Sequence, residues 1–250
     1  MLELKDVSVI FNQGTQLEKV ALHDMSCKIQ DGDFITLLGS NGAGKSTLFN
    51  VISGSVEVSQ GSVYMDGIDI TNEKEHVRAK NIGRLFQNPE HGTAKHLTVE
   101  ENLALAYSAR KRGLFSLAVH KEDREYFKEK LRTLDMGLED RLKTPIGLLS
   151  GGQRQAVALI MAVLNPPKIL LLDEHTAALD PKSAKKILRI TNELIEKEHI
   201  TALMITHNIN DALVNGNRLF IMNDGTLIQD FETERKKQLK PADILNYYEV

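Results

Sequence analysis

The 250-residue sequence predicts an α/β fold in which helices cover a mostly parallel β-sheet. Three apolar runs predict buried strands, at residues 33–39, 168–174 and 200–207. Helix-like segments separate these runs, and strands that alternate with helices along a chain favour parallel pairing. We therefore expect a sheet whose strand ends carry the residues that bind ligands.

The predicted helices carry recognisable signals at their ends. The helix that follows the first run closes at Gly54, and a long amphipathic helix begins at Pro181 with Asp180 as its cap. A hairpin is predicted over residues 218–230, with its Asp-Gly pair at the turn. The tail, residues 232–250, is predicted to be a helical and solvated end.

The pattern changes in the middle of the chain, where no strand of comparable quality is predicted. Thr98 and Glu101 form a capping box at the start of one helix, and a second, charged amphipathic helix is expected to end at Gly137. These features predict a helical subdomain, residues 87–149, inserted into one core domain. The two parts of that core are residues 1–86 and 150–250.

Composition excludes several classes of protein. With 31 basic and 34 acidic residues, the net charge is −3, and no electrostatic footprint for nucleic acid is present. The single cysteine, Cys27, excludes an internal disulfide framework, fits a reducing compartment, and is expected to be a buried, inert thiol in a strand. No secretory signal is recognised, and no apolar run approaches the ~20 residues that span a bilayer. We therefore expect a chain that is soluble when isolated.

The segment GSNGAGKST, residues 39–47, matches the phosphate-binding pattern G-x-x-x-x-G-K-[ST] between a strand and a helix. Its glycines let backbone N–H groups point at phosphate oxygens, and the helix N-terminus adds partial positive charge. Lys45 is expected to reach the β- and γ-phosphates, and the Ser46 hydroxyl to ligate Mg²⁺. A glycine-rich turn without a ligand is disfavoured, because strand, spacing and the Lys-Ser pair are all present. The predicted nucleotide contacts are Gly39, Ser40, Asn41, Gly42, Ala43, Gly44, Lys45, Ser46 and Thr47.

Two adjacent carboxylates, Asp173 and Glu174, follow the buried run of aliphatic residues at 169–172. In proteins with this phosphate-binding loop, a second strand ends in a carboxylate that faces the same metal ion. Asp173 is therefore expected to hold Mg²⁺ through water, and Glu174 to orient or deprotonate the attacking water. Without the phosphate-binding segment, the pair would be an ordinary solvated loop.

The segment LSGGQ, residues 149–153, opens a strongly apolar helix. Ser150 and Gln153 form a capping box, and the two glycines between them expose backbone N–H groups to a close ligand. The alternative is a well-capped core helix without a ligand. Since residues 39–47 already provide one phosphate site, a second such helix N-terminus suggests contact with a nucleotide held by another copy of the chain.

LSGGQ between GSNGAGKST and LLLDE resembles the signature of ATP-binding-cassette (ABC) ATPases, and the resemblance covers nearly the whole chain in the same order. It implies a P-loop NTPase core with a mostly parallel sheet, an N-terminal antiparallel β-subdomain and an inserted α-helical subdomain. It also implies a head-to-tail dimer that holds two ATP molecules and Mg²⁺. Each ATP is then expected between the phosphate-binding loop of one copy, residues 39–47 (the P-loop), and the signature of the other copy. The signature residues expected to contact ATP are Ser150, Gly151, Gly152 and Gln153.

Four further residues match positions of the family pattern. Gln87 resembles the glutamine that joins the metal site to the helical subdomain, and is expected to ligate Mg²⁺ and take part in catalysis. Asp180 resembles a residue of the loop that crosses the dimer interface, a role compatible with helix capping. His207 resembles the switch histidine that contacts the γ-phosphate, with a purely structural histidine as the alternative. Phe11 resembles the aromatic residue that stacks on adenine, and a core phenylalanine is its alternative.

His175 departs from the family pattern, which commonly has proline after the glutamate. Histidine is expected to leave the loop freer than proline and to add a titratable group near the γ-phosphate. A subfamily variation without a catalytic role is the favoured interpretation. The segment DEHTAALDP, together with GSNGAGKST and GNRLFIMNDG, resembles a bacterial amino-acid importer subfamily with members linked to tryptophan or tyrosine uptake.

The resemblance implies the ATPase subunit of an importer for amino acids or another small solute, at the cytoplasmic face of the cell membrane. The expected partners are a second copy of the chain, integral membrane permease subunits and an extracellular substrate-binding lipoprotein that acts through the permease. Other classes are a cassette of translation or DNA repair, a separate exporter cassette, and a small-molecule kinase. The single P-loop disfavours a translation cassette, the short helical insertion disfavours a repair cassette, and LSGGQ disfavours a kinase.

Overall fold

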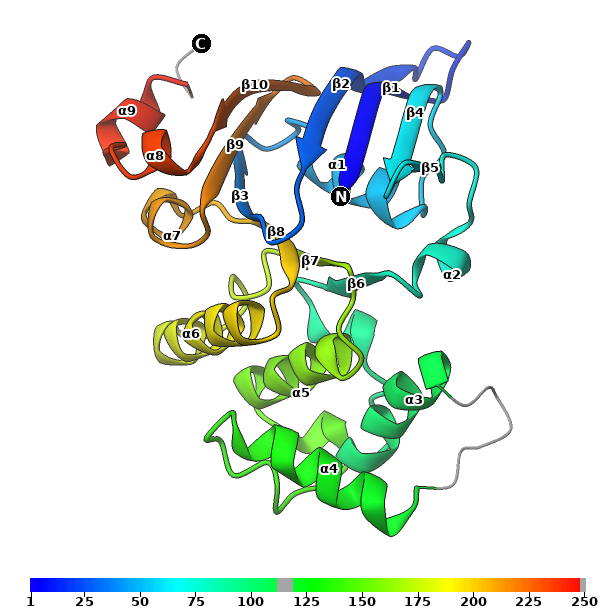
Figure 1. The fold of residues 1–250 in the computed structure, drawn as a ribbon, viewed down its shortest axis with the longest axis vertical. Coiled ribbons are helices and arrows are strands. Elements are labelled where there is room, and N and C mark those ends of the chain that lie inside the picture. Colours follow the sequence, from blue (N-terminus) through cyan, green and yellow to red (C-terminus); the bar gives the residue numbers. More distant parts are fainter. Residues whose placement is uncertain (112–118, 248–250) are drawn as a thin grey trace. The chain divides into compact units, whose positions relative to one another are not determined.

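The computed structural model describes residues 1–111 and 119–247, which fall into two compact units (Figure 1). The first unit combines Met1–Ile82 with His199–Val250, and the second unit spans Gly83–Glu198. The predicted α/β class is confirmed, because the chain forms a sheet of mostly parallel strands, a separate antiparallel sheet and several helices.

An antiparallel sheet opens the first unit, with the strand order β2-β1-β4-β5. Bulges shift the register of β1 against its neighbours, and Asp6 and Asp24 lie at these irregularities with φ angles of 48° and 44°. Cys27 on β2 is buried, which confirms the expected burial in a strand, and burial raises the pKa of its thiol to about 12. The elements are β1 (Leu2–Phe11), β2 (Lys19–Ile29), β4 (Gln60–Met65), β5 (Ile68–Asp69) and the short helix α2 (Glu75–Arg78).

The parallel part of the first unit has the strand order β10-β9-β3-β8. Strand β3 pairs in parallel with both neighbours, so that Leu37 lies beside Ile205 of β8 and Phe220 of β9. The predicted hairpin is confirmed, because β10 returns antiparallel to β9. The strands are β3 (Phe34–Gly39), β8 (Thr201–Ile205), β9 (Arg218–Asn223) and β10 (Thr226–Phe231). The helices are α1 (Lys45–Ser53), α7 (Ile209–Val214), α8 (Thr233–Lys236) and α9 (Pro241–Leu245).

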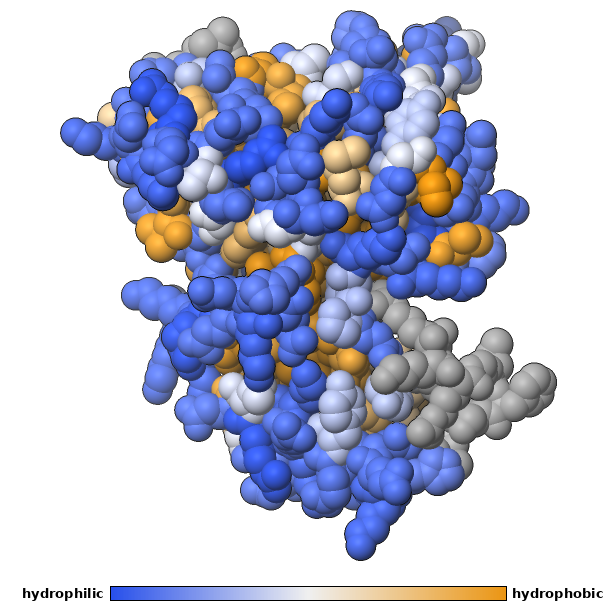
Figure 2. Space-filling model, viewed as in Figure 1, coloured by the Kyte–Doolittle hydropathy of each residue, from blue (hydrophilic) through white to orange (hydrophobic). Residues whose placement is uncertain are grey.

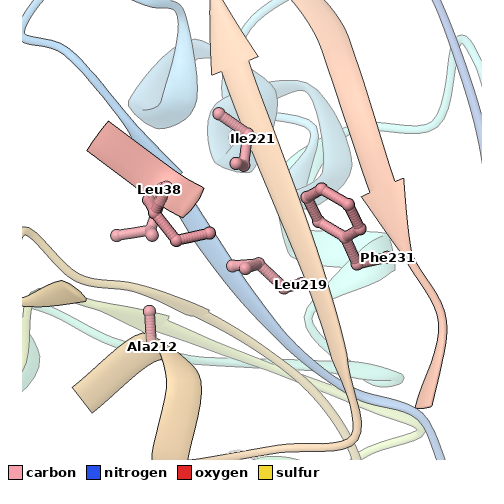
Figure 3. Close-up of a cluster of buried hydrophobic side chains, with 6 residues drawn as sticks. Leu38, Ala212, Leu219, Ile221 and Phe231 are labelled. Atoms are coloured by element: carbon pink, nitrogen blue, oxygen red, sulfur yellow. The ribbon is translucent and has the colours of Figure 1, made fainter. Parts of the chain in front are cut away.

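Apolar side chains of β3, β9 and β10 form a core with helices α7 and α9 (Figure 3). Every residue of β3 is buried, as its uninterrupted apolar run predicts. Leu38 belongs to the same cluster as Leu219, Phe231 and Ile244. Since Ile244 of α9 is fully buried, the expectation of a simply solvated tail is wrong for this helix. The single apolar face of such a short helix was not evident from the charged sequence around it.

A buried lysine also ties the tail to the strand that leads to the P-loop. Lys236 of α8 is 4% exposed, and its ammonium group donates to Thr36 Oγ1 of β3 at 3.0 Å. It further donates to the backbone carbonyls of Asn215, Gly216 and Arg218. Burial lowers the pKa of Lys236 to about 7, and the oxygen acceptors around it satisfy the donors of its charged form. The tail is therefore part of the folded first unit.

The second unit carries β7 and nearly all of β6, which are neighbours in one sheet. Its helices follow the amphipathic patterns of the sequence, and α5 packs against α3, α4 and α6. The elements are β6 (Ile82–Leu85), α3 (Val99–Lys111), α4 (Lys121–Arg132), α5 (Gly151–Val163), β7 (Ile169–Asp173) and α6 (Pro181–Lys197), with 3-10 turns at Pro89–Gly92 and Ile146–Leu148. The subdomain limits proposed at residues 87 and 149 stay a prediction.

Two of the predicted helix ends in the second unit have different outcomes. The capping box at the start of α3 is confirmed, because Glu101 Oε2 accepts a hydrogen bond from Thr98 N at 2.7 Å. Helix α4, however, ends at Arg132 rather than at Gly137. The chain leaves helical geometry at Asp135, whose φ of 50° places it in the left-handed region before the glycine is reached.

A buried carboxylate joins the helices of the second unit. Glu100 of α3 is 3% exposed and accepts hydrogen bonds from Arg124 Nε at 2.9 Å, Arg124 Nη2 at 3.0 Å and Lys143 Nζ at 2.9 Å. The bonds from Arg124 hold the pKa of Glu100 below its usual range. This ion pair ties α3 to α4.

The face of the molecule in Figure 2 is largely polar. Figure 2 shows a mostly hydrophilic face on which apolar side chains form small patches. Exposed large apolar residues include Leu17, Leu148 and Val214. None of the helices in residues 1–111 and 119–247 has the length and hydropathy that a membrane span requires.

Candidate nucleotide-binding site

The P-loop lies in the first unit, in the turn that joins β3 to α1. Gly42 and Gly44 have φ angles of 88° and 94°, which glycine adopts without the clash of a Cβ atom. Lys45 is 6% exposed, and its Nζ donates to the carbonyl of Gly39 at 2.8 Å and to that of Ser40 at 2.9 Å. The ammonium group therefore lies at the loop whose N–H groups the sequence assigns to phosphate.

Close packing accounts for two of the three loop glycines. A Cβ on Gly39 would lie 2.4 Å from a carbonyl oxygen of β9, and one on Gly44 would lie 2.7 Å from a carbonyl oxygen of β2. The turn of the β9–β10 hairpin also supports the loop, because Gly225 N donates to Ala43 O at 3.1 Å. Gly42 differs, since no atom lies within 4 Å of its Cβ position. The loop thus has an open side at Gly42 and packed sides at the other two glycines.

His207 and Phe11 also belong to the first unit. His207 is exposed and follows β8, the parallel neighbour of β3, so it emerges at the same edge of the sheet as the P-loop. Just before it, Thr206 N donates to Leu37 O of β3 at 3.3 Å. Phe11 ends β1 and is 38% exposed, which contradicts the alternative of a core phenylalanine.

The second unit brings two of the predicted catalytic residues together. Glu174 Oε2 accepts a hydrogen bond from Gln87 Nε2 at 3.0 Å, directly after the end of β7 at Asp173. Asp173 Oδ2 is 3.1 Å from Arg84 Nη2 in an ion pair whose side chains are 17% and 15% exposed. The Arg84 guanidinium lies 4.8 Å from the centre of the Phe86 ring. No motif pointed to Arg84, because its partner Asp173 lies 89 residues further along the chain.

His175 does not occupy the position that the sequence suggested. It is 1% exposed, and burial lowers the pKa of its imidazole to about 4. Its Nε2 lies 3.2 Å from Thr191 Oγ1 of α6. The expectation of a freer loop with a titratable group near the γ-phosphate is therefore wrong, because the ring is packed inside the second unit and neutral at physiological pH. Glu174, just before it, has a φ of 45°, which non-glycine residues rarely adopt.

The signature segment opens α5 as expected. Gln153 N donates to Ser150 Oγ at 3.3 Å, and Ser150 N donates to Gln153 Oε1 at 3.3 Å. Gly151 is exposed, whereas Gly152 is buried, and a Cβ on Gly152 would lie 2.9 Å from the side chain of Ser183 on α6. Helix packing within the second unit thus requires the second glycine, which is a reason that the sequence did not reveal.

The two residues after the signature hold the chain on both sides of Gln87. Arg154 Nη1 pairs with Glu90 Oε1 at 3.0 Å, and Gln155 Nε2 donates to Phe86 O at 3.2 Å. Gln155 is fully buried. These contacts connect the first turn of α5 to the segment that positions Gln87. They were missed because their partners lie far away in the sequence, although two polar residues in a buried helix were a signal.

Asp180 caps α6, as predicted. Its Oδ1 accepts hydrogen bonds from Lys182 N at 3.2 Å and Ser183 N at 3.1 Å. The hydrogen bonds from Ser183 lower the pKa of the Asp180 carboxyl group. An ionised carboxylate at this end also complements the partial positive charge of the helix N-terminus.

The residues predicted to hold Mg²⁺ carry the donor types that this ion prefers. They are the Ser46 hydroxyl, the Gln87 amide oxygen and the Asp173 carboxylate. Among residues 1–111 and 119–247, no group of three or more His, Cys, Asp or Glu side chains is arranged to hold a metal ion. A set with one carboxylate fits an Mg²⁺ ion that arrives with a nucleotide, because such an ion takes other ligands from phosphates and water.

A family model described as ABC transporter matches residues 22–177, a range that contains the P-loop, the signature and both carboxylates. The chain belongs to the ABC transporter family. It is an ABC-type ATPase, homologous to cassettes that hydrolyse ATP.

Individual relatives of this ABC ATPase cover most or all of the chain. The tyrosine transport ATP-binding protein of Clostridioides difficile (strain R20291) is 39% identical over 250 residues, which are 100% of this chain and 99% of the relative. The energy-coupling factor transporter ATP-binding protein EcfA2 of Caldanaerobacter subterraneus subsp. tengcongensis is 34% identical over 229 residues, covering 90% of this chain and 77% of that protein. A dimeric post-hydrolysis structure of the ATP-binding cassette MJ0796, bound to ADP and Pi, has a TM-score of 0.80 and 31% identity. That match covers 93% of this chain and 99% of the other.

Proposed function

We propose that the chain is the ATP-hydrolysing subunit of a membrane importer for amino acids or another small solute. The observation that carries the ATPase chemistry is the hydrogen bond from Gln87 to Glu174, beside Asp173 at the end of β7. The transport role draws on the tyrosine transport relative, which aligns over the full length of the chain. An aromatic amino acid is the substrate class that this relative suggests.

The P-loop binds the triphosphate of ATP in this proposal. Its N–H groups and Lys45 contact phosphate oxygens, and the exposed Phe11 stacks on adenine. Ser46, Gln87 and Asp173 hold Mg²⁺, Asp173 through water. When bound, the ion neutralises negative charge on the β- and γ-phosphates.

Glu174 is the proposed catalytic base. It orients a water molecule toward the γ-phosphorus and accepts the proton that this water loses as the bond to ADP breaks and Pi forms. Gln87 supports this role because its amide donates to the carboxylate at 3.0 Å. His207 contacts the γ-phosphate from the end of β8. Hydrolysis of this kind depends mainly on positioning and charge stabilisation.

A second copy of the chain completes each nucleotide site in this proposal. The homologous cassette bound to ADP and Pi is a dimer, which supports such an arrangement. Ser150, Gly151, Gly152 and Gln153 of one copy contact the ATP held by the other, and Asp180 lies in the loop at the interface. ATP favours the closed pair and hydrolysis lets it reopen, because ATP and its products bind the two states differently.

The proposed partners place the chain at the membrane. Permease subunits dock near Gln87 and the segment after it, so that closure of the dimer moves the permease. An extracellular substrate-binding lipoprotein delivers the solute to the permease. The ATPase subunit is then peripheral, at the cytoplasmic face of the cell membrane.

Co-purification tests the transport role. The tagged Glu174→Gln variant, which keeps ATP bound, is isolated from gently solubilised membranes with Mg-ATP, and its partners are identified by mass spectrometry. A multi-spanning permease with a lipoprotein is the expected result. The tagged Lys45→Ala variant, which binds ATP poorly, is the matched control. Recovery only from the soluble fraction with ribosomes or DNA-repair proteins would rule out the transport role and leave the ATPase chemistry standing.

The substrate class is tested on the lipoprotein recovered in this way. Calorimetric titration with tyrosine, tryptophan and the branched-chain amino acids is expected to show tightest binding of an aromatic amino acid. Preference for a branched-chain amino acid, or for a solute of another class, would overturn the aromatic assignment.

A further inference from the structure

We propose that His175 is a positioning residue for Glu174. Through a hydrogen bond to Thr191 of α6, its ring fixes the left-handed turn that holds the Glu174 carboxylate beside Gln87. The inference rests on the catalytic role proposed for Glu174. It replaces the interpretation of His175 as a variation without a role in catalysis.

The first step is the burial of both partners. His175 is 1% exposed and Thr191 is fully buried, on the face of α6 that also buries Ile187, Ile190 and Leu194. Their polar atoms, His175 Nε2 and Thr191 Oγ1, are 3.2 Å apart. A polar pair inside an apolar surround is costly unless both groups are satisfied, so the bond selects one position of the ring.

The second step is the direction of the hydrogen bond. The Thr191 hydroxyl has one hydrogen, which it donates to the carbonyl oxygen of Ile187 at 2.9 Å. Because a carbonyl can only accept, the two hydrogen bonds form together only when Thr191 Oγ1 accepts from the ring and His175 Nε2 carries the hydrogen. The two bonds together thus place a hydrogen on Nε2, and burial favours the neutral form of the imidazole. No other tautomer satisfies both bonds.

The third step is the backbone before the ring. Glu174 has a φ of 45°, a conformation that persists in a non-glycine residue only where neighbouring structure imposes it. Strand β7 fixes the chain before Glu174, and the buried ring of His175 fixes the chain directly after it. Within the turn, Ala177 N donates to Glu174 O at 2.9 Å. Glu174 is therefore held from both sides.

The fourth step leads from the backbone to the carboxylate. The left-handed turn sets the direction of the Glu174 side chain, whose Oε2 accepts from Gln87 Nε2 at 3.0 Å. A general base must lie within hydrogen-bond reach of the water that it activates, so a small displacement of this carboxylate slows the reaction strongly. His175 thus acts on catalysis through Glu174 and without contact to the substrate.

Four variants test the proposal in ATPase assays that resolve kcat from KM. His175→Leu and Thr191→Val remove one partner each, and kcat is expected to fall about tenfold or more while KM for ATP stays within about twofold. His175→Gln keeps an N–H donor near the position of Nε2 and is expected to restore most of the activity. Thr133→Val is a control for the loss of a threonine hydroxyl, because the exposed Thr133 Oγ1 also donates to a backbone carbonyl of α4 and lies away from the turn at Glu174.

A double variant separates positioning from folding. His175→Leu with Thr191→Val makes both sides apolar, which preserves stability far better than either single change. We expect a Tm near that of the wild type together with a low kcat. Wild-type kcat in this double variant, or in folded His175→Leu, would overturn the proposal. So would a His175→Gln variant as slow as His175→Leu.

The ring itself provides an independent readout. Long-range proton–nitrogen NMR correlations of the wild type are expected to show the Nε2–H tautomer for His175, identified by its loss in His175→Gln. An Nδ1–H tautomer would overturn the hydrogen-bond direction. Loss of turnover in Glu174→Gln tests the proposed function separately. Only in a protein that passes that test does the kcat ratio of His175→Leu to His175→Gln report on positioning.

Discussion

Two strand-to-helix turns of this cassette are built by different means. The turn from β3 to α1 is made by backbone, with Gly42 and Gly44 in left-handed conformations and a lysine bound to loop carbonyls. The turn from β7 to α6 is made by side chains: Glu174 takes up a left-handed conformation without being glycine, His175 is buried and Asp180 caps the helix. The conformation of the first turn is set by residues within the turn itself, whereas that of the second turn depends on residues elsewhere in the second unit.

This difference shows which of the two turns needs supporting contacts to hold a strained backbone conformation. A glycine reaches a positive φ at little cost, so the P-loop needs few supporting contacts for its shape. A glutamate in that region needs surrounding structure to hold it, and Gln87 and Thr191 belong to that structure. A substitution outside the turn can therefore shift the conformation of a side-chain-built turn. A backbone-built turn is disrupted mainly by substitutions within the turn.

The largest expected effect separates binding from turnover. Lys45→Ala in the first turn is expected to abolish ATP binding and hydrolysis together, because the proposed role of this lysine is to contact the phosphates. Glu174→Gln in the second turn should keep ATP binding while kcat falls by about 10² to 10⁴. Titration with a fluorescent ATP analogue and a phosphate-release assay measure the two properties. Near-normal hydrolysis in Glu174→Gln would remove this residue from its role.

The next effect concerns the stability of the backbone-built turn. An alanine at Gly44 combines a strained φ with a Cβ 2.7 Å from a carbonyl oxygen, and should lower the free energy of unfolding by about 3 kcal/mol. Gly42→Ala is the matched control, because its φ is similar but its Cβ meets no atom within 4 Å. It should cost about 1 kcal/mol. Equal losses in urea unfolding would show that close packing is unimportant at Gly44.

The side-chain-built turn should instead show a dependence on pH. Burial lowers the pKa of His175 from 6.5 to about 4, so below pH 6.5 the unfolded chain binds a proton that the folded chain does not. The contribution of the neutral, buried His175 to the free energy of unfolding is complete above pH 6.5 and is lost as the pH falls toward 4. Between pH 7.5 and 5.5, the wild type should lose about 1 kcal/mol relative to His175→Gln. An unchanged difference between the two proteins would contradict a buried, neutral His175.

The smallest expected effect lies at the end of the second turn. Asp180→Ala removes the acceptor for two N–H groups of α6. It should lower Tm less than Gly44→Ala does, because Asp180 is exposed and water can replace its carboxylate. Asp180→Asn retains an oxygen acceptor and should lie close to the wild type in differential scanning fluorimetry. A lower Tm for the asparagine than for the alanine variant would argue against the capping role.

The parts of the fold that the sequence predicted have local causes. Apolar runs gave the buried strands β3, β7 and β8, and end signals such as Asp180 and the pair Thr98 and Glu101 gave helix starts. These features depend on residues within one turn of each other. The predicted end of α4 was wrong because Gly137 is a strong stop signal, whereas Asp135, where the chain takes up a left-handed conformation just after the helix, is a weak one.

The parts that escaped prediction depend on pairs distant in the sequence. Arg84 was missed because only its ion pair with Asp173 connects it to the candidate site. His175 was placed in a loose loop because its partner Thr191 lies in the helix that follows, on a face recognisable only after packing. The proposed catalytic side chains were named from motifs, whereas the residues that contact them lie in other elements of the fold.

The anchor of the tail has a consequence for how the chain is made. Lys236 and Thr36 are 200 residues apart, and the strands that pair with β3 also come from the late part of the sequence. On the ribosome, the P-loop strand therefore waits with both edges unpaired while the entire second unit is synthesised. The nucleotide-binding sheet is completed last, so a nascent cassette gains its mature phosphate loop only near the end of translation.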